Sequence, residues 1–193
     1  MLNPEERLVC DGPTVERHIA SMARQLADGR RPDAPLCLVG IRTRGVPLAD
    51  RLAQELSRIL GADVGVGAVE ITLYRDDLGQ GQRWPVLHGT EIPFNIDGAD
   101  LVLVDDVLFT GRTVRAALNA ICDLGRPASV RLAVLVDRGH REIPIQADVV
   151  GLRVATERDD HVRVQLQPVD PIDQVGWLEA GPKPSPIDGR TQP

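Results

Sequence analysis

Residues 101–113 read Leu-Val-Leu-Val-Asp-Asp-Val-Leu-Phe-Thr-Gly-Arg-Thr, and this stretch decides the fold class. Its first four residues are apolar, which is typical of a strand that is buried on both faces of a parallel sheet. Two carboxylates cannot continue such a core. Asp105 and Asp106 are therefore predicted to lie at the carboxyl edge of the sheet, where open α/β folds bind ligands.

A phosphate site is predicted directly after this acid pair. Thr110, Gly111 and the next two residues open a helix expected over residues 114–124. A helix start offers unsatisfied N–H groups, which a phosphate can approach closely beside a glycine. Since carboxylates accept hydrogen bonds from vicinal hydroxyls, the stretch predicts a ribose 5-phosphate site. The simpler alternative is that the acid pair and the Thr-Gly turn only cap the helix.

Bulk properties are compatible with a small soluble enzyme. With 193 residues, 42% of them hydrophobic and 26% charged, the chain can bury one core. No apolar run has the length of a membrane span and the first residues are polar, so we expect no signal peptide and a cytoplasmic location. Cys10, Cys37 and Cys122 are too scattered for a disulfide frame or a zinc site, and no side-chain metal site is expected. The formal charge of -6 argues against a wholly basic nucleic-acid binder.

Strand and helix patterns alternate along the chain, as in α/β proteins. We expect one domain over residues 1–180, a flexible lid loop or hairpin over 75–97, and a disordered tail over 181–193. The predicted helices cover residues 13–27, 47–60 and 114–124, and the predicted strands cover 36–41, 64–74, 101–104 and 130–136, followed by short strand-like pieces up to 166.

Three further segments follow predicted strands, namely residues 39–45, 71–78 and 132–144. The first places two arginines in a turn, and guanidinium forks fit phosphate oxygens while Gly45 permits close backbone approach. Taken alone, the first could be a solvated basic turn and the second a strand end with solvated charges. The motif in 101–113 resembles the phosphoribosyl pyrophosphate (PRPP) motif of type I phosphoribosyltransferases. Together the segments resemble the PyrR family, bifunctional regulators of pyrimidine operons, over residues 8–170.

This resemblance implies a type I phosphoribosyltransferase fold, with a mostly parallel central sheet flanked by helices and a small hood. The implied reaction is uracil plus PRPP giving UMP plus pyrophosphate, assisted by Mg²⁺, with Asp105, Asp106 and Arg44 as catalytic residues. The implied PRPP and UMP site comprises Asp105, Asp106, Val107, Leu108, Phe109, Thr110, Gly111, Arg112 and Thr113. The other implied contacts are a pyrophosphate loop of Arg42, Thr43, Arg44 and Gly45, a lid with Tyr74, Arg75, Asp76 and Asp77, and a base side with Val136, Asp137, Arg138 and Ile143.

Phe109 departs from the purine-type relatives, which carry an acid just before the Thr-Gly pair. A carboxylate base at this position is therefore excluded, and no proton acceptor for uracil is identified. Phe109 favours a pyrimidine, although ordinary packing beneath the loop explains it equally well. The alternative function is a phosphoribosyltransferase for another base, without a role in RNA binding.

The resemblance also implies a UMP-responsive, RNA-binding attenuator that recognises a hairpin in leader mRNA and forms homodimers or larger homo-oligomers. Arg24, Thr43, His140 and Arg141 match the RNA-binding face of the family. Such side chains would contact phosphates and position the RNA without reading its sequence. Three positions, Ala20, Gln146 and Leu152, depart from the hydroxyl or basic residues of that face. Residues 138–141 could instead be a solvated turn or a dimer contact.

Overall fold

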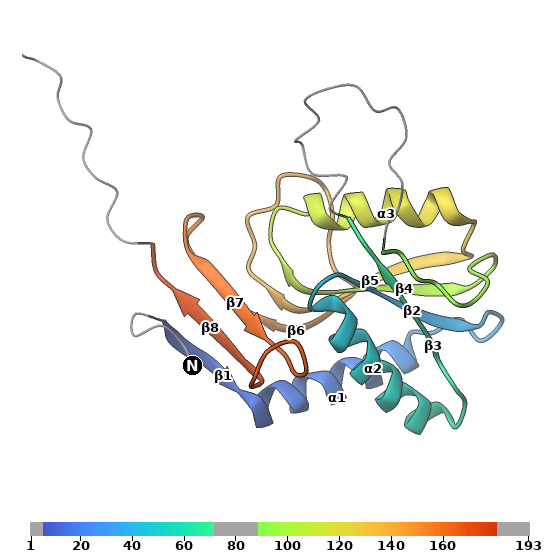
Figure 1. Ribbon diagram of the computed structural model, residues 1–193, viewed down its shortest axis with the longest axis horizontal. Coiled ribbons are helices and arrows are strands. Elements are labelled where there is room, and N and C mark those ends of the chain that lie inside the picture. Colours follow the sequence, from blue (N-terminus) through green and yellow to red (C-terminus); the bar gives the residue numbers. More distant parts are fainter. Residues whose placement is uncertain (1–5, 72–88, 181–193) are drawn as a thin grey trace, which may run out of the picture.

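The computed structural model describes residues 6–71 and 89–180 of the chain. Strands and helices alternate through most of this part, as the sequence predicts (Figure 1). The elements are β1 (Arg7–Asp11), α1 (Gly12–Asp28), β2 (Leu36–Ile41), α2 (Gly45–Leu60), β3 (Gly65–Val69), β4 (Asp100–Leu108), α3 (Arg112–Leu124), β5 (Ser129–Asp137), β6 (Val149–Arg153), β7 (His161–Gln165) and β8 (Gln174–Leu178).

The central sheet has five strands in the order β3-β2-β4-β5-β6, and every neighbouring pair is parallel. Helices α1 and α2 cover one face of the sheet and α3 covers the other (Figure 1). Alternate residues of β4 serve the two sides: Val102 and Val104 pack with α1 and α2, whereas Leu101 and Leu103 pack with α3. This confirms the α/β fold with a mostly parallel, doubly covered sheet.

Strand β4 is longer than the sequence predicts. The expectation that it ends before the acid pair is wrong, because it runs to Leu108 and Asp105 faces Val134 of β5 in the ladder. Backbone pairing does not depend on side-chain polarity, so the ladder passes through both aspartates. The side chain of Asp105 is consequently buried, with 5% of its surface exposed.

A second, antiparallel sheet has the order β1-β8-β7 and joins the two ends of the described chain. It lies beside the central sheet, on the side of β6 and α1 (Figure 1), and is the small hood that the resemblance implies. The sequence indicates β6 and β7 only as strand-like pieces, and it does not predict β1 or β8. Both strands have only five residues and β1 is largely exposed, so their hydrophobic pattern is weak.

The predicted helix boundaries are close to the observed ones. Helix α1 begins after Asp11, whose carboxylate accepts the Thr14 N–H at 3.0 Å. Helix α2 begins at Gly45, two residues before the predicted Pro47, and Gly61 ends it in the left-handed region (φ 66°). No helix among the described residues is long and apolar enough to cross a membrane.

Part of the expected lid is described. Strand β3 ends at Val69, earlier than predicted, and Glu91 forms an isolated antiparallel bridge with Ala68. The remainder of the predicted strand and lid, residues 72–88, lies outside the described residues, as does the predicted tail over 181–193.

Candidate active site

The acid pair lies near the carboxyl end of β4, where the backbone N–H of Asp106 donates to the Asp105 carboxylate at 2.9 Å. Burial raises the pKa of Asp105 well above that of an ordinary aspartate, and the charge of Asp106 raises it further. Burial also raises the pKa of Asp106, although the nearby Arg44 guanidinium opposes that rise. A buried and a half-buried carboxylate side by side favour any ligand that donates hydrogen bonds or brings positive charge.

The turn after β4 leads into α3 through Gly111, which has a φ of 91°. A Cβ at this residue would lie 2.9 Å from Ile143 Cγ1, so both the backbone and the packing require glycine. The N-cap residue Gly111 has no side chain to cap α3, and the Thr110 hydroxyl accepts the Arg112 N–H at 3.4 Å. A helix start offers backbone N–H groups, and this one lies where the sequence predicts a phosphate.

The predicted pyrophosphate turn follows β2 and contains a cis peptide bond between Arg42 and Thr43. The Arg42 Nε donates to the Gly89 carbonyl at 2.9 Å. Arg44 is paired with Asp170: Nε and Nη2 donate to the two carboxylate oxygens at 2.8 and 2.9 Å. Arg44 thereby connects this turn to the β7–β8 loop of the hood.

Gly45 was predicted to permit the approach of a phosphate. In the structure its missing side chain serves packing, because a Cβ would lie 2.4 Å from the Val104 carbonyl oxygen. Gly40 of β2 must also lack a side chain, because a Cβ there would lie 2.5 Å from the Gly45 carbonyl oxygen. The two glycines let the start of α2 lie directly against β2 and β4, next to the acid pair.

The predicted base-side loop follows β5 and is organised by Arg141. Its guanidinium donates to the Phe109 carbonyl at 2.8 Å, the Ile145 carbonyl at 3.1 Å and the Asp137 carboxylate at 2.6 Å. Although burial opposes it, the bond from Arg141 leaves the pKa of Asp137 lowered. Arg141 thus clamps this loop against the end of β4, and Val136 beneath it is fully buried.

Phe109 packs between two residues of that loop. The Arg138 guanidinium lies over its ring, 4.1 Å from the centroid, and the His140 ring meets it edge-on at 6.0 Å. The structure therefore brings the predicted phosphate loop and the predicted base side together through side-chain contacts.

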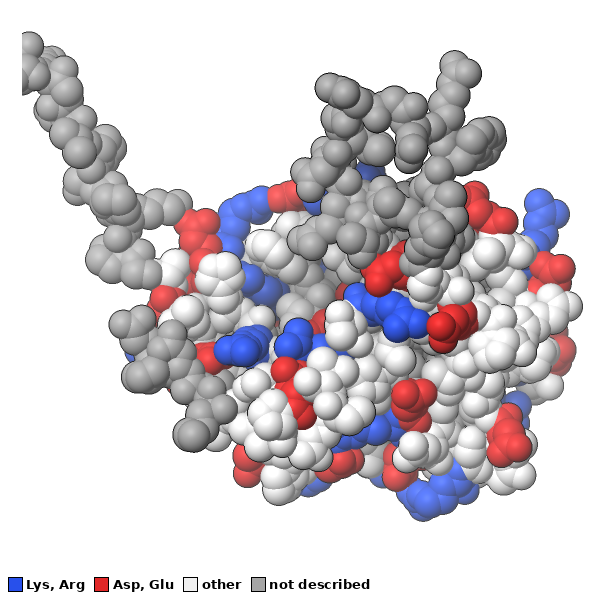
Figure 2. Space-filling model, viewed as in Figure 1, with Lys and Arg blue, Asp and Glu red and all other residues white. Residues whose placement is uncertain are grey.

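The residues predicted to contact RNA differ in their surroundings. Arg24 on α1 and Thr43 are exposed, whereas the His140 ring nitrogen lies 2.7 Å from the Thr156 carbonyl oxygen and Arg141 is engaged inside its loop. On the face shown in Figure 2, basic and acidic side chains alternate without a large basic area.

Sequence reasoning gave no site role to two residues that the structure places among the predicted ones. One is Asp170, the partner of Arg44. The other is Glu142, whose N–H donates to the Thr110 carbonyl at 3.0 Å and whose carboxylate accepts from Arg112 at 2.7 Å and from Arg158. Glu142 stands in the charged turn that the sequence marks, but no pattern in the sequence points to Asp170. The predicted lid residues, Tyr74 to Asp77, lie outside the described residues.

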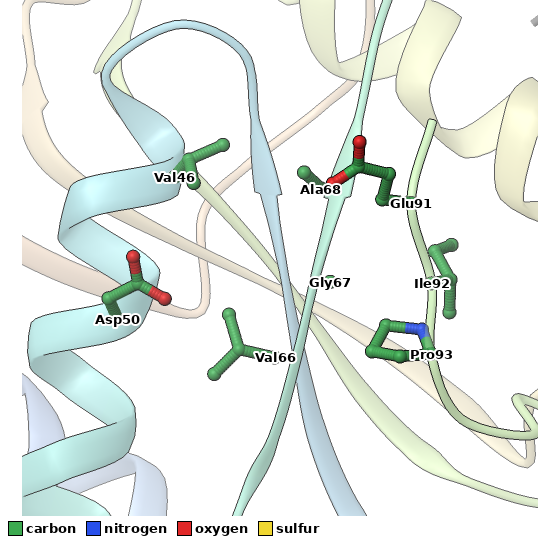
Figure 3. Close-up of a pocket in the computed structure, with 8 residues that line it drawn as sticks. All are labelled: Val46, Asp50, Val66, Gly67, Ala68, Glu91, Ile92 and Pro93. Atoms are coloured by element: carbon green, nitrogen blue, oxygen red, sulfur yellow. The ribbon is translucent and has the colours of Figure 1, made fainter. Parts of the chain in front are cut away.

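Two cavities adjoin the start of α2. One of about 400 Å³ lies between the Arg42 turn and the Pro168–Val169 segment, next to Asp170. The other, of about 490 Å³, crosses the edge of β3 and contains none of the predicted site residues (Figure 3). Figure 3 shows Asp50 on α2 at one side of that cavity and Glu91 at the other. The larger cavity is lined by Val46, Asp50, Val66, Gly67, Ala68, Glu91, Ile92 and Pro93.

The chain is similar to known phosphoribosyltransferases. The family model described as a phosphoribosyl transferase domain matches residues 9–170. Relatives named bifunctional protein PyrR share about half of their residues with this chain. The one from Roseiflexus sp. is 52% identical, covering 86% of this chain and 90% of its own. The one from Pelotomaculum thermopropionicum is 50% identical, covering 91% and 97%.

The chain belongs to the PyrR family of phosphoribosyltransferases. Among solved structures, the hypoxanthine phosphoribosyltransferase of Trypanosoma cruzi has a TM-score of 0.67 at 19% identity, covering 91% of this chain and 97% of that one. At this identity the likeness shows the fold alone. PyrR membership and the shared fold confirm the resemblance and the type I phosphoribosyltransferase fold that the sequence predicts.

Proposed function

We propose that this chain is a uracil phosphoribosyltransferase, which converts uracil and PRPP to UMP and pyrophosphate. The observation that carries the proposal is the arrangement at the end of β4. Asp105 is buried and Asp106 is half-buried beside it, shortly before the left-handed Gly111 and the start of α3, with Arg44 near Asp106. A diol acceptor, a phosphate cradle and an arginine are the groups that a ribose with phosphates at both ends requires.

The chemistry follows from this arrangement. Uracil N1 forms a bond to the ribose C1 while the bond from C1 to the pyrophosphate oxygen breaks, and the leaving pyrophosphate keeps the electron pair. Positive charge develops on the sugar, where Asp105 and Asp106 would stabilise it. Negative charge develops on pyrophosphate, beside Arg44. The N1 proton leaves uracil, and we assign no side chain as its acceptor.

We propose that Mg²⁺ enters together with PRPP. Among the described residues, no three His, Cys, Asp or Glu side chains come together as a metal site. Magnesium often binds through one or two carboxylates and the substrate's own oxygens, and the acid pair suits that mode. When bound, Mg²⁺ would neutralise charge on pyrophosphate.

Phe109 supports uracil over a purine. An apolar ring held between Arg138 and His140 stands where purine-type relatives carry an acid. The base side would then be formed by Val136, Asp137, Arg138 and Ile143. A phosphoribosyltransferase that acts on another base remains the alternative.

The enzyme proposal is tested by incubating the protein with PRPP, Mg²⁺ and one free base at a time: uracil, orotate, hypoxanthine or guanine. We expect UMP from uracil and little product from the others. The matched variant Asp106→Asn should lose most of this activity, whereas Asp33→Asn, which alters an exposed carboxylate paired with Arg31, should keep it. Product from another base in place of UMP would establish the alternative.

We also propose the second role of the family, that of an RNA-binding regulator that responds to UMP. The relatives are named bifunctional proteins, which supports a second role, and Arg24 and Thr43 are exposed. Binding of the leader hairpin from the protein's own operon should tighten with UMP. Arg24→Ala should reduce the salt slope by about 1, as expected for one phosphate contact, whereas the exposed Arg115→Ala on α3 should not. Equal binding of a scrambled hairpin would count against this role.

Two further proposals accompany these roles. A protein that uses PRPP and contacts a leader transcript would work in the cytoplasm. We propose that it forms a homodimer or a larger homo-oligomer, for which sedimentation equilibrium is the direct measurement.

A further inference from the structure

The Arg44 guanidinium is held by a carboxylate that the sequence does not connect with it. Asp170 stands 126 residues later in the chain and takes Nε and Nη2 of Arg44 in a bidentate pair, at 2.8 and 2.9 Å. Its side chain is only 9% exposed, and that of Arg44 is 31% exposed. A forked pair of this kind fixes the plane of the guanidinium as well as its distance.

Asp170 is itself fixed by its own loop. Its carboxylate accepts the Leu166 N–H at 2.9 Å, and its N–H donates to the Leu166 carbonyl at 2.8 Å. The Arg44 bond lowers the pKa of Asp170, which keeps the carboxylate ionised at neutral pH. Asp170 is therefore held in place by the hood loop, and the orientation of Arg44 depends on Asp170.

A second pair joins the same hood loop to α2. Arg51, later on α2, contacts Asp173 at 3.1 Å, and Asp173 accepts the Gln167 N–H at 2.8 Å. Arg51 also pairs with Glu16 of α1. The hood loop is thus attached at two places, to α2 through Arg51 and to the predicted pyrophosphate turn through Arg44.

The bidentate pair leaves one edge of the Arg44 guanidinium available. Asp170 takes the Nε–Nη2 edge, whereas Nη1 donates to no hydrogen bond among the described residues. The remaining Nη1–Nη2 edge is a second fork, suited to two oxygens of a phosphate. Arg44 also lies close enough to Asp106 for their charges to interact, so this fork belongs to the acid-pair end of the site.

We propose that Asp170 is a positioning residue that aims the free fork of Arg44 at the pyrophosphate of PRPP. This inference rests on the proposed function. Asp170 does not touch the reacting atoms and acts through Arg44. Without it, the guanidinium would lose its fixed plane and pair with Asp106, on the acid pair itself.

Pyrophosphate and PRPP binding test the inference, measured by calorimetry with Mg²⁺ present. We expect Asp170→Asn to weaken the binding of both by about 10-fold or more, as for a displaced positioning group. The KM for PRPP should rise much more than the KM for uracil. Asp173→Asn, which weakens the other attachment of the same loop, should leave pyrophosphate binding close to that of the unchanged protein.

A double-mutant cycle that combines Asp170→Asn with Arg44→Lys distinguishes positioning of the guanidinium from a general loosening of the hood loop. Lysine cannot form the fork, so adding Asp170→Asn to Arg44→Lys should change binding little further. Equal binding by Asp170→Asn and the unchanged protein, an equal loss in Asp173→Asn, or additive losses in the cycle would each overturn the inference. Pyrophosphate binding needs no base, so a protein that binds it but makes no UMP would refute the proposed function and leave this test intact. A protein that binds neither pyrophosphate nor PRPP would overturn both.

Discussion

The guanidinium of Arg138 lies 4.1 Å from the centroid of the Phe109 ring, and it is almost fully buried there, with 6% of the residue exposed. Its Nη2 also donates to the Glu157 carbonyl at 2.8 Å, and its backbone N–H donates to the Leu108 carbonyl at 3.1 Å. Burial lowers the pKa of Arg138, but an arginine stays charged at neutral pH. Arg138, a residue of the base-side loop, is therefore joined to the phosphate loop and to the β6–β7 loop.

A double-mutant cycle should detect this contact. We expect Phe109→Leu and Arg138→Met to couple by about 1–2 kcal/mol in the free energy of unfolding, the range of a desolvated cation–π pair. Urea unfolding of the two single variants and the double variant gives the coupling. Additivity within about 0.3 kcal/mol would show that the stacking has no energetic weight.

Asp105→Asn should stabilise the fold at neutral pH. Because the pKa of Asp105 is raised on folding, the folded state holds its proton more tightly than the unfolded state. The contribution of protonated Asp105 to the free energy of unfolding is fully present below the unfolded pKa, about 4. It is lost as the pH rises through the folded pKa. The advantage of Asp105→Asn should thus be large at pH 7 and vanish near pH 3. Urea unfolding across this range measures it, and a pH-independent difference would contradict the assignment.

That stabilisation should be accompanied by a loss of function. Asp105→Asn is expected to lower kcat/KM for UMP synthesis about 100-fold, as for the removal of one electrostatic group from a site. A stabilised but fully active variant would remove Asp105 from the proposed site.

Gly45→Ala should be strongly destabilising, because its Cβ would lie 2.4 Å from the Val104 carbonyl oxygen. We expect the free energy of unfolding to fall by about 3 kcal/mol, at the upper end for overpacking. The atoms that the Cβ would meet belong to the backbone of Val104 and Asp105, which cannot move aside easily. Gly29→Ala is the matched control: its Cβ would meet the tip of the Arg131 side chain at 3.2 Å and a carbonyl at 3.3 Å. Thermal unfolding compares the two, and equal Tm values would contradict the packing argument.

Arg131→Met should cost stability without affecting the site. Asp100 is fully buried at the amino end of β4 and accepts Arg131 Nη2 at 2.8 Å, together with the Ser129 hydroxyl and the Arg31 N–H. Removing its cation should cost about 3 kcal/mol, as for a broken buried pair. Arg58→Met breaks an exposed pair with Glu55 and should cost under about 1 kcal/mol. UMP synthesis by folded Arg131→Met should be unchanged, because Asp100 lies at the opposite end of β4 from Asp105.

The fold was largely predictable because the central strands are continuous apolar runs and the three helices are amphipathic. Residues 36–41 were predicted as a strand and form one with the same bounds. The hood was harder to predict, since β1 and β8 are short strands from opposite ends of the chain that are defined by each other. Local patterns carry no information about such pairing.

The candidate site likewise contains a part that the sequence predicts and a part that it does not. Asp105, Asp106 and the Thr-Gly turn are contiguous, so their spacing alone indicated a ribose and a phosphate. The packing role of Gly45 could not be predicted, because the Val104 carbonyl that it accommodates lies on β4, far along the chain. Arg141, expected to contact RNA, is occupied by carbonyls of its own loop and of Phe109, which no linear pattern reveals.

The sequence by itself determined the α/β class and the stretch that carries the site, because strand and helix periodicity and the acid pair before Thr-Gly are local properties of 101–113. Only the tertiary structure decided that β4 runs through its two aspartates, that Arg138 covers Phe109, and that Asp170 holds Arg44. Each of these depends on which distant segments come into contact. That choice follows from burying the whole core at once, and no single segment encodes it.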